Sequence, residues 1–150
     1  APLYDEPVAI VGWDDGVSTW NVFFATNRDV TLSPDGRAAI GSRCLAQPSY
    51  GRVQVTLPKR RRGEDAAVTP PKPLPAWLGG PKEPPTVDPA TLARVDTVTG
   101  TPWETFLAGV NDQVARSRQQ DVLIFVHGFN VKFDDAVARA AQIALDMPFN

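Results

Sequence analysis

A short run of large apolar residues constrains the fold most strongly, because it stands between two segments with the periodicity of amphipathic helices. It covers residues 122–126 and reads VLIFV. A run with no polar residue on either face predicts a β-strand that is covered on both sides, as in parallel sheets flanked by helices. The run follows Asp121 and stops at His127-Gly128, where we expect a tight turn. The order helix, buried strand, turn and helix predicts an α/β fold.

The helix before this run has a predicted start and a predicted end. Thr101 as cap, Pro102 at the first helical position and Glu104 three residues after the cap form the pattern of a capping box. Five apolar residues then share one helical face: Trp103, Phe106, Leu107, Val110 and Val114. We expect the helix to end within residues 116–120, where cationic side chains suit its negative end.

The helix after the run has an equally regular apolar face and is predicted to end at Met147-Pro148. The apolar positions at helical spacing are Phe133, Val137, Ala140, Ala141, Ala144 and Leu145. Asp134 and Asp135 are adjacent, so on a helix their side chains diverge and make a poor catalytic pair. They belong more naturally to the first helical turn, which favours negative charge.

The first 57 residues predict strands joined by turns. Residues 8–11 and 21–26 are rich in β-branched and aromatic residues around the turn sequence of residues 14–16, and residues 33–36, SPDG, are a second turn. Residues 51–57 alternate between apolar and polar side chains, which is the two-residue period of a half-buried strand. We therefore assign residues 1–57 to strands at the start of a sheet.

The composition changes after residue 58, because nine of the fifteen prolines lie within residues 58–89. Proline removes a backbone donor, so this segment is expected to be an extended surface excursion. It includes the basic run of residues 59–62, KRRR, which we interpret as a solvated loop. The chain is then divided into strands (1–57), a proline-rich surface excursion (58–100) and the helix-strand-helix unit (101–150), all parts of one incomplete domain.

Composition excludes several classes of partner. The formal charge of −2 gives no reason to expect nucleic-acid binding, and no apolar run approaches the roughly 20 residues of a membrane span. Cys44 is the only cysteine and is expected to be a small buried residue, so no disulfide, metal site or cofactor is expected. No signal peptide is visible, and since the chain opens with Ala1 the compartment stays open between the cytoplasm and export with a signal removed.

The turn after the apolar run can bind a developing negative charge. Gly128 lacks a Cβ and lets the backbone approach a substrate closely. The backbone N–H of Phe129 is then the candidate donor of an oxyanion hole, the group of donors that stabilises the negative oxygen of an acyl-transfer transition state.

Several stretches resemble a bacterial family of α/β-hydrolases known as DUF900, which is described as esterase-like or lipase-like. They are LIFVHGFN at residues 123–130, VFFATNR at 22–28, YGRVQVTLP at 50–58, and residues 106–147, which include the His-Gly-Phe turn. The resemblance implies a mixed, mostly parallel sheet flanked by helices and hydrolysis of a small ester-type substrate. It also implies that the Phe129 amide forms half of the oxyanion hole. Gly128 would enable this contact, and His127 and Asn130 would support the loop; His127 would not be the catalytic base.

The serine nucleophile that this resemblance implies is not found in the sequence. None of the serines (Ser18, Ser33, Ser42, Ser49 and Ser117) stands in the G-x-S-x-G pattern. We therefore expect serine, acid and base in a C-terminal remainder of the fold, and no turnover by these residues alone. Either that remainder or self-association would cover the apolar strand. The alternative is a non-catalytic α/β scaffold, or an interaction module that uses the proline-rich basic loop.

Overall fold

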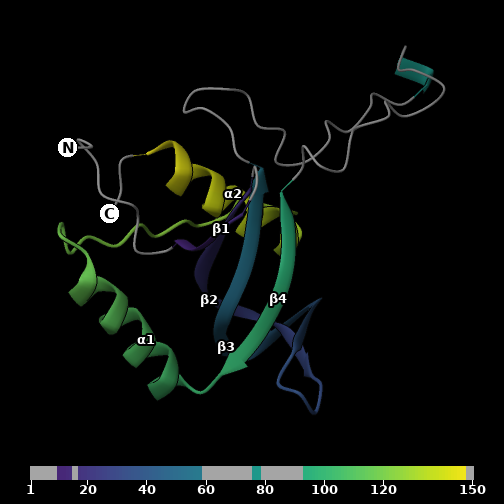
Figure 1. Cartoon of the computed structure of the whole chain (residues 1–150). Helices are drawn as coiled ribbons and strands as arrows, with labels where there is room; N and C mark the ends of the chain where they lie inside the picture. The colour runs from purple at the N-terminus through teal and green to yellow at the C-terminus, as the bar shows by residue number, and fades with distance from the viewer. Residues whose placement is uncertain (1–9, 15–16, 59–75, 79–92, 148–150) are drawn as a thin grey trace.

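The computed structural model describes residues 10–14, 17–58, 76–78 and 93–147. Four strands form one sheet in the order β1-β2-β3-β4, and two helices follow it in the chain (Figure 1). The elements are β1 (Ile10–Asp14), β2 (Val17–Leu32), β3 (Ala38–Pro58), the short 3-10 helix η1 (Ala76–Leu78), β4 (Arg94–Thr101), α1 (Trp103–Arg116) and α2 (Phe133–Asp146). In the described part of the chain, neither helix is both long enough and apolar enough to cross a membrane.

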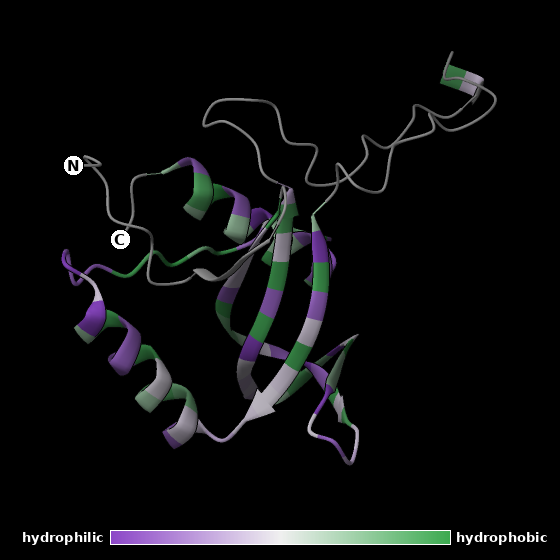
Figure 2. Ribbon diagram, in the orientation of Figure 1, coloured by the Kyte–Doolittle hydropathy of each residue, from purple (hydrophilic) through white to green (hydrophobic). Residues whose placement is uncertain are grey.

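The predicted turn at residues 33–36 is confirmed, and the predicted alternation of residues 51–57 is confirmed up to Val55. The Gly36 N–H donates to the Ser33 carbonyl at 2.9 Å, and Gly36 has a φ of +81°, which only glycine adopts readily. Along β3, Val53, Val55 and Leu57 are fully buried, whereas Arg52 is exposed. The exception is Thr56, which was expected on the polar side and is buried. Hydrophobic and hydrophilic residues alternate along this strand in Figure 2.

The sheet carries one helix on each face, as the two adjacent phenylalanines of β2 show. Successive strand residues point to opposite faces. The ring of Phe23 stacks edge-on against Phe106 of α1, with centroids 5.8 Å apart, and the ring of Phe24 stacks against Phe133 of α2 at 5.0 Å. The α2 face holds the core, whose buried members are Trp20, Phe24, Val53, Val55, Leu57, Val137 and Ala141.

Helix α1 ends at Arg116 as predicted, but its predicted capping box is wrong. The N-cap residue is Pro102, and no side chain caps the helix. Thr101 is instead the last residue of β4 and pairs with Tyr50 of β3, so its position is set by the sheet. No residue of α1 is buried. The helix contacts the sheet through a cluster of rings formed by Phe23, Tyr50, Trp103 and Phe106.

Helix α2 confirms the prediction more closely. It has Asp134 and Asp135 in its first turn, and it buries Val137 and Ala141 of the predicted apolar face against the sheet. The helix ends at Asp146, next to the predicted stop at Met147. The apolar face of α2 is buried because it lies against the wide apolar surface of β2 and β3. Helix α1 has such a surface opposite only part of its length.

The prediction of a buried central strand at residues 121–126 is wrong for this structure. These residues form no strand, and the four described strands pair only antiparallel, not in the mixed and mostly parallel arrangement expected. Ile124 is 79% exposed and Val126 83% exposed. The physical reason is pairing: apolar β-branched residues favour a strand, but a strand also needs a hydrogen-bonded neighbour, and no described strand lies against this segment.

Two further expectations need correction. Residues 94–101 form β4, because their backbone pairs with β3, so the surface excursion assigned to residues 58–100 cannot include them. Pro58 is the last residue of β3, and of the remaining residues only η1 and Ala93 are described, so the basic run lies outside the described residues. Cys44 is exposed, not buried, because it stands on the outer part of the β2-β3 hairpin, where no helix covers the strands.

Candidate functional site

The His-Gly-Phe loop joins the extended segment of residues 121–126 to the start of α2 (Figure 1). All four candidate site residues, His127, Gly128, Phe129 and Asn130, lie together on it and are exposed. Phe129 projects fully into solvent, with a relative exposure of 101%. The loop is therefore open to a ligand on the side of its tip.

The imidazole of His127 holds the carbonyl that precedes the candidate donor. Its Nδ1 lies 2.8 Å from the Gly128 oxygen. A carbonyl oxygen only accepts, so Nδ1 must carry the proton in this contact. The Gly128 carbonyl and the Phe129 N–H belong to one planar peptide unit, in which they point in opposite directions. A fixed direction of the carbonyl therefore also fixes the direction of the Phe129 N–H.

Two residues of the loop, Gly128 and Asn130, differ in backbone conformation, because only Asn130 is left-handed. Asn130 has a φ of +55°, in the left-handed region that asparagine tolerates better than most residues. Gly128 is not in that region, and a Cβ built on it would meet no atom within 4 Å. A requirement for glycine at position 128 would therefore come from the close approach of a ligand and not from strain in the loop.

A contact from the sheet holds the far side of the loop, and the sequence alone did not reveal it. The guanidinium of Arg28, on β2, donates to the carbonyl oxygen of Val131. The two residues are 103 positions apart. Arg28 lies in the stretch VFFATNR (residues 22–28), and the resemblance of this stretch to the DUF900 family was the one sign in the sequence that Arg28 could belong to the site. The loop is thus held at its start by its own histidine and at its end by the sheet.

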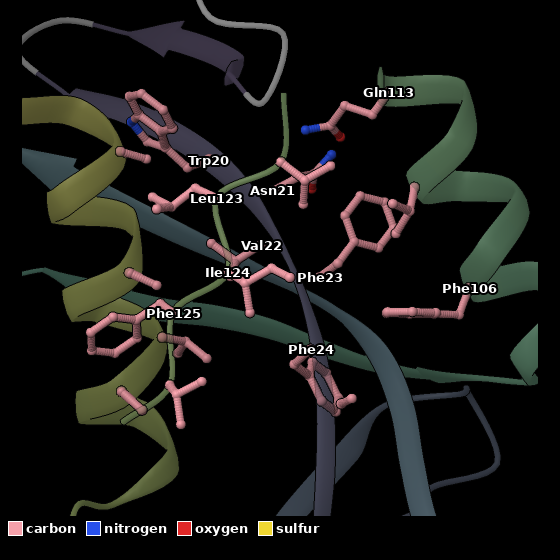
Figure 3. Close-up of a pocket in the computed structure, with 18 of the residues that line it drawn as sticks. Trp20, Asn21, Val22, Phe23, Phe24, Phe106, Gln113, Leu123, Ile124 and Phe125 are labelled. Carbon is pink, nitrogen blue, oxygen red and sulfur yellow. The ribbon is translucent and has the colours of Figure 1, made fainter. Parts of the chain in front are cut away.

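An apolar cavity of about 670 Å³ lies beside the loop (Figure 3). Its walls are consecutive residues of β2 (20–26), the extended segment (121–127) and the facing sides of both helices. Figure 3 shows Leu123 and Phe125 directed toward α2, while Ile124 points away from that helix. Their exposures follow the same alternation, at 38% and 37% against 79%. The segment is therefore extended like a strand, although none of the described strands pairs with it.

None of the serines lies where a strand turns into a helix, which is the position of a nucleophile elbow. Ser18 is buried within β2, and its oxygen accepts a hydrogen bond from the Trp20 indole at 2.8 Å. Ser117 is buried at the end of α1, and Ser33, Ser42 and Ser49 belong to the β2-β3 hairpin. In the described ranges, no three histidine, cysteine or acidic residues come together as a metal site would require.

Comparison with known proteins gives one match. Residues 104–150 match the model of a family described as "Alpha/beta hydrolase of unknown function (DUF900)". This range contains most of α1, the extended segment, the His-Gly-Phe loop and α2. No curated protein and no solved structure matches the chain. The resemblance to the DUF900 family of α/β-hydrolases is therefore confirmed over residues 104–150.

Proposed function

We propose that this chain supplies the oxyanion loop of a serine-type α/β-hydrolase that cleaves carboxylic esters or related acyl compounds. The N–H of Phe129 is the donor. The observation that carries the proposal is the orientation of this peptide unit, whose carbonyl is held by the His127 ring in a loop anchored to β2 by Arg28. The match of residues 104–150 to a hydrolase family supports the same conclusion.

In the proposed reaction a serine oxygen from another part of the fold adds to the ester carbonyl carbon, and its proton passes to a histidine in that part. The carbonyl oxygen becomes negatively charged and accepts a hydrogen bond from the Phe129 N–H. The bond to the alcohol then breaks, and the alcohol leaves with the proton. Water releases the acyl group as an acid and restores the serine. One donor of this kind lowers the barrier by about 3 kcal/mol.

The proposal assigns supporting roles to the neighbours of Phe129. His127 is assigned to loop support and not to the base, because in the chain order of α/β-hydrolases the base follows the nucleophile, which the proposal places in the remainder of the fold. Gly128 leaves room for the substrate oxygen, since nothing within 4 Å occupies the place of a Cβ. Asn130 completes the turn into α2 in a left-handed conformation. Nucleophile, acid and base are assigned to the remainder of the fold.

A pair of substitutions at one position tests the role of the backbone donor. Phe129→Pro removes the N–H, whereas Phe129→Ala removes only the side chain. The residue before the proline would be Gly128, which tolerates the restriction that proline imposes. In the polypeptide that includes the proposed remainder, Phe129→Pro should lower kcat for a short p-nitrophenyl ester by about 100- to 1000-fold. Phe129→Ala should stay within about threefold of the parent. Equal activity of both variants would contradict the proposed donor.

Covalent labelling of the active site distinguishes the hydrolase from the alternative, a non-catalytic α/β scaffold. A fluorophosphonate probe should modify one serine of the longer polypeptide, and mass spectrometry should locate it outside residues 1–150. No labelling of a folded protein would favour the scaffold.

A further inference from the structure

The β2-β3 hairpin is irregular at Arg28, the residue that anchors the end of the oxyanion loop. On one side of Arg28, two steps along β2 correspond to five steps along β3, and on the other side two steps correspond to four. The pairs that define this register are Thr26–Ser49, Arg28–Cys44 and Val30–Ile40. The extra residues of β3 form β-bulges, which bend a hairpin and change the direction of its side chains. Arg28 therefore lies at a bend of the hairpin.

Beyond this bend the tip of the hairpin returns to β4. Arg37, near the tip, forms an isolated bridge with Thr99 of β4, and the outer part of the hairpin passes behind β4 in Figure 1. A Cβ built on Gly100 would lie 2.8 Å from Cδ2 of Leu32, so a side chain near the tip also reaches β4. The bend is thus held by the sheet on its inner side and by the returning tip on its outer side.

Two side chains bind backbone N–H groups at the bend. A bulge leaves residues of the bulged strand without their ladder partners. The N–H of Arg28 donates to Oγ1 of Thr26 at 3.2 Å. Across the hairpin, the N–H of Arg43 donates to Oδ1 of Asp29 at 2.7 Å. Hydrogen bonds to a charged acceptor are roughly twice as strong as neutral ones, so the carboxylate of Asp29 makes the stronger of these two contacts.

The carboxylate of Asp29 lies against Gly41, in the place that a side chain would take. A Cβ built on Gly41 would lie 2.6 Å from Cγ of Asp29 and nearer still to both carboxylate oxygens. Because the carboxylate is the end of a flexible side chain, it would turn away and leave the N–H of Arg43. The absence of a side chain at Gly41 is therefore what allows the contact between Asp29 and Arg43.

We propose that Asp29 and Gly41 are positioning residues of the oxyanion loop and that they act through Arg28. The carboxylate fixes the bulged part of β3, this part fixes the course of β2 opposite it, and β2 carries Arg28 to the loop. The proposal rests on the proposed function, in which this loop supplies the donor. It adds the bend of the hairpin to the candidate site.

The link from Arg28 to the donor is short. The guanidinium of Arg28 binds the carbonyl of Val131, two residues after Phe129. Two residues of chain span at most about 7 Å, so a displacement of Val131 is passed on to the Phe129 N–H. A misplacement of about 1 Å at a catalytic group can lower a rate about 100-fold. A change at the bend of the hairpin should therefore alter kcat.

Substitutions of two aspartates on the same hairpin test the proposal in the polypeptide that includes the proposed remainder. Asp29→Ala should lower kcat for a short p-nitrophenyl ester at least about 10-fold and leave KM within about twofold, because the donor acts in the transition state. Asp29→Asn keeps an oxygen that accepts the N–H of Arg43 and should stay within about threefold of the parent. Asp35→Ala is the matched control, since Oδ1 of Asp35 accepts the N–H of Arg37 at 3.2 Å near the tip, and kcat should not change.

A double-mutant cycle separates the role of the carboxylate from general damage to the hairpin. Gly41→Ala should lower kcat about as much as Asp29→Ala, because the added Cβ displaces the carboxylate. In the Asp29→Ala background the same change should have no further effect, since no carboxylate remains to be displaced. Effects of the two substitutions that multiply independently would contradict the proposal.

The order parameter of the Phe129 amide, measured by ¹⁵N relaxation in residues 1–150, tests the coupling without any need for activity. It should fall by at least about 0.15 in Asp29→Ala and in Gly41→Ala, from a parent value of about 0.85, and stay unchanged in Asp35→Ala. Equal values in Asp29→Ala and Asp35→Ala would overturn the proposal, as would a parent value already below about 0.6. The expected loss of order without esterase activity in the longer polypeptide would instead reject the reaction and retain the coupling.

Discussion

Replacement of Gly51 by alanine should weaken the centre of the sheet through a steric conflict that the structure locates. A Cβ on Gly51 would lie 2.2 Å from the backbone oxygen of Thr99 and 2.6 Å from Cζ of Phe24. A carbon and an oxygen without a covalent bond normally stay about 3.3 Å apart. Thr99 belongs to the neighbouring strand β4, so its oxygen cannot move without disturbing the pairing of β3 with β4.

The size of the effect follows from three terms. Overpacking costs about 1–3 kcal/mol, and a weakened hydrogen bond between the strands costs about 1 kcal/mol. Alanine offsets about 0.4–1 kcal/mol by restricting the unfolded chain. We therefore expect Gly51→Ala to lower the free energy of unfolding by about 1–3.5 kcal/mol. The corresponding decrease in Tm is roughly 2–14 °C for a chain of this length.

Urea and thermal denaturation followed by far-UV circular dichroism measure both quantities, and two other glycines provide controls. Gly128→Ala meets no atom within 4 Å and has no left-handed backbone, so stability should change by less than about 0.5 kcal/mol. Gly36→Ala has equal space but a φ of +81°, and should cost about 1 kcal/mol. If the Gly51→Ala and Gly128→Ala variants have the same Tm, then β3 and β4 do not approach each other as closely as in the structure.

Two further predictions concern the core and the loop anchor. Leu57 is fully buried and Leu32 is 60% exposed, so Leu57→Ala should cost about 2–5 kcal/mol in urea denaturation and Leu32→Ala less than about 1 kcal/mol. Similar costs would contradict the assignment of the core. Arg28→Ala should speed hydrogen exchange in residues 128–131 several-fold, because it removes the hydrogen bond to Val131, while the exposed Arg52→Ala should not. Unchanged exchange in Arg28→Ala would show that the loop is held by other contacts.

The sequence predicted the features that depend on neighbouring residues. The alternation that ends at Leu57, the turn at Gly36 and the apolar face of α2 all follow from local periods or from backbone preferences. Beyond these local patterns, the features depend on only one long-range condition, which is the presence of a core on one side. The structure therefore has them at nearly the predicted residues.

The features that depend on distant pairing could not be predicted in the same way. Thr101 has the local pattern of a cap, but its pairing with Tyr50 places it in a strand. The anchor from Arg28 to Val131 joins residues that no local pattern connects. Residues 122–126 have the composition of a buried strand, yet a strand forms only beside a partner. The candidate loop was found from its own sequence, whereas one of the residues that hold it, Arg28, lies far away in the chain.

The adjacent rings of Phe23 and Phe24 have a consequence for how β2 can align with its neighbours. A slip of one residue would turn every side chain of the strand to the opposite face. Phe23 would then leave the ring of Phe106 on α1, and Phe24 would leave the ring of Phe133 on α2. In either direction, however, the slip puts one phenylalanine in the place of the other, with Val22 or Ala25 in the place that is vacated, so one helix keeps a ring contact with β2 and the other loses it. The alignment of β2 is thus coupled to the docking of a helix, on one face of the sheet or on the other.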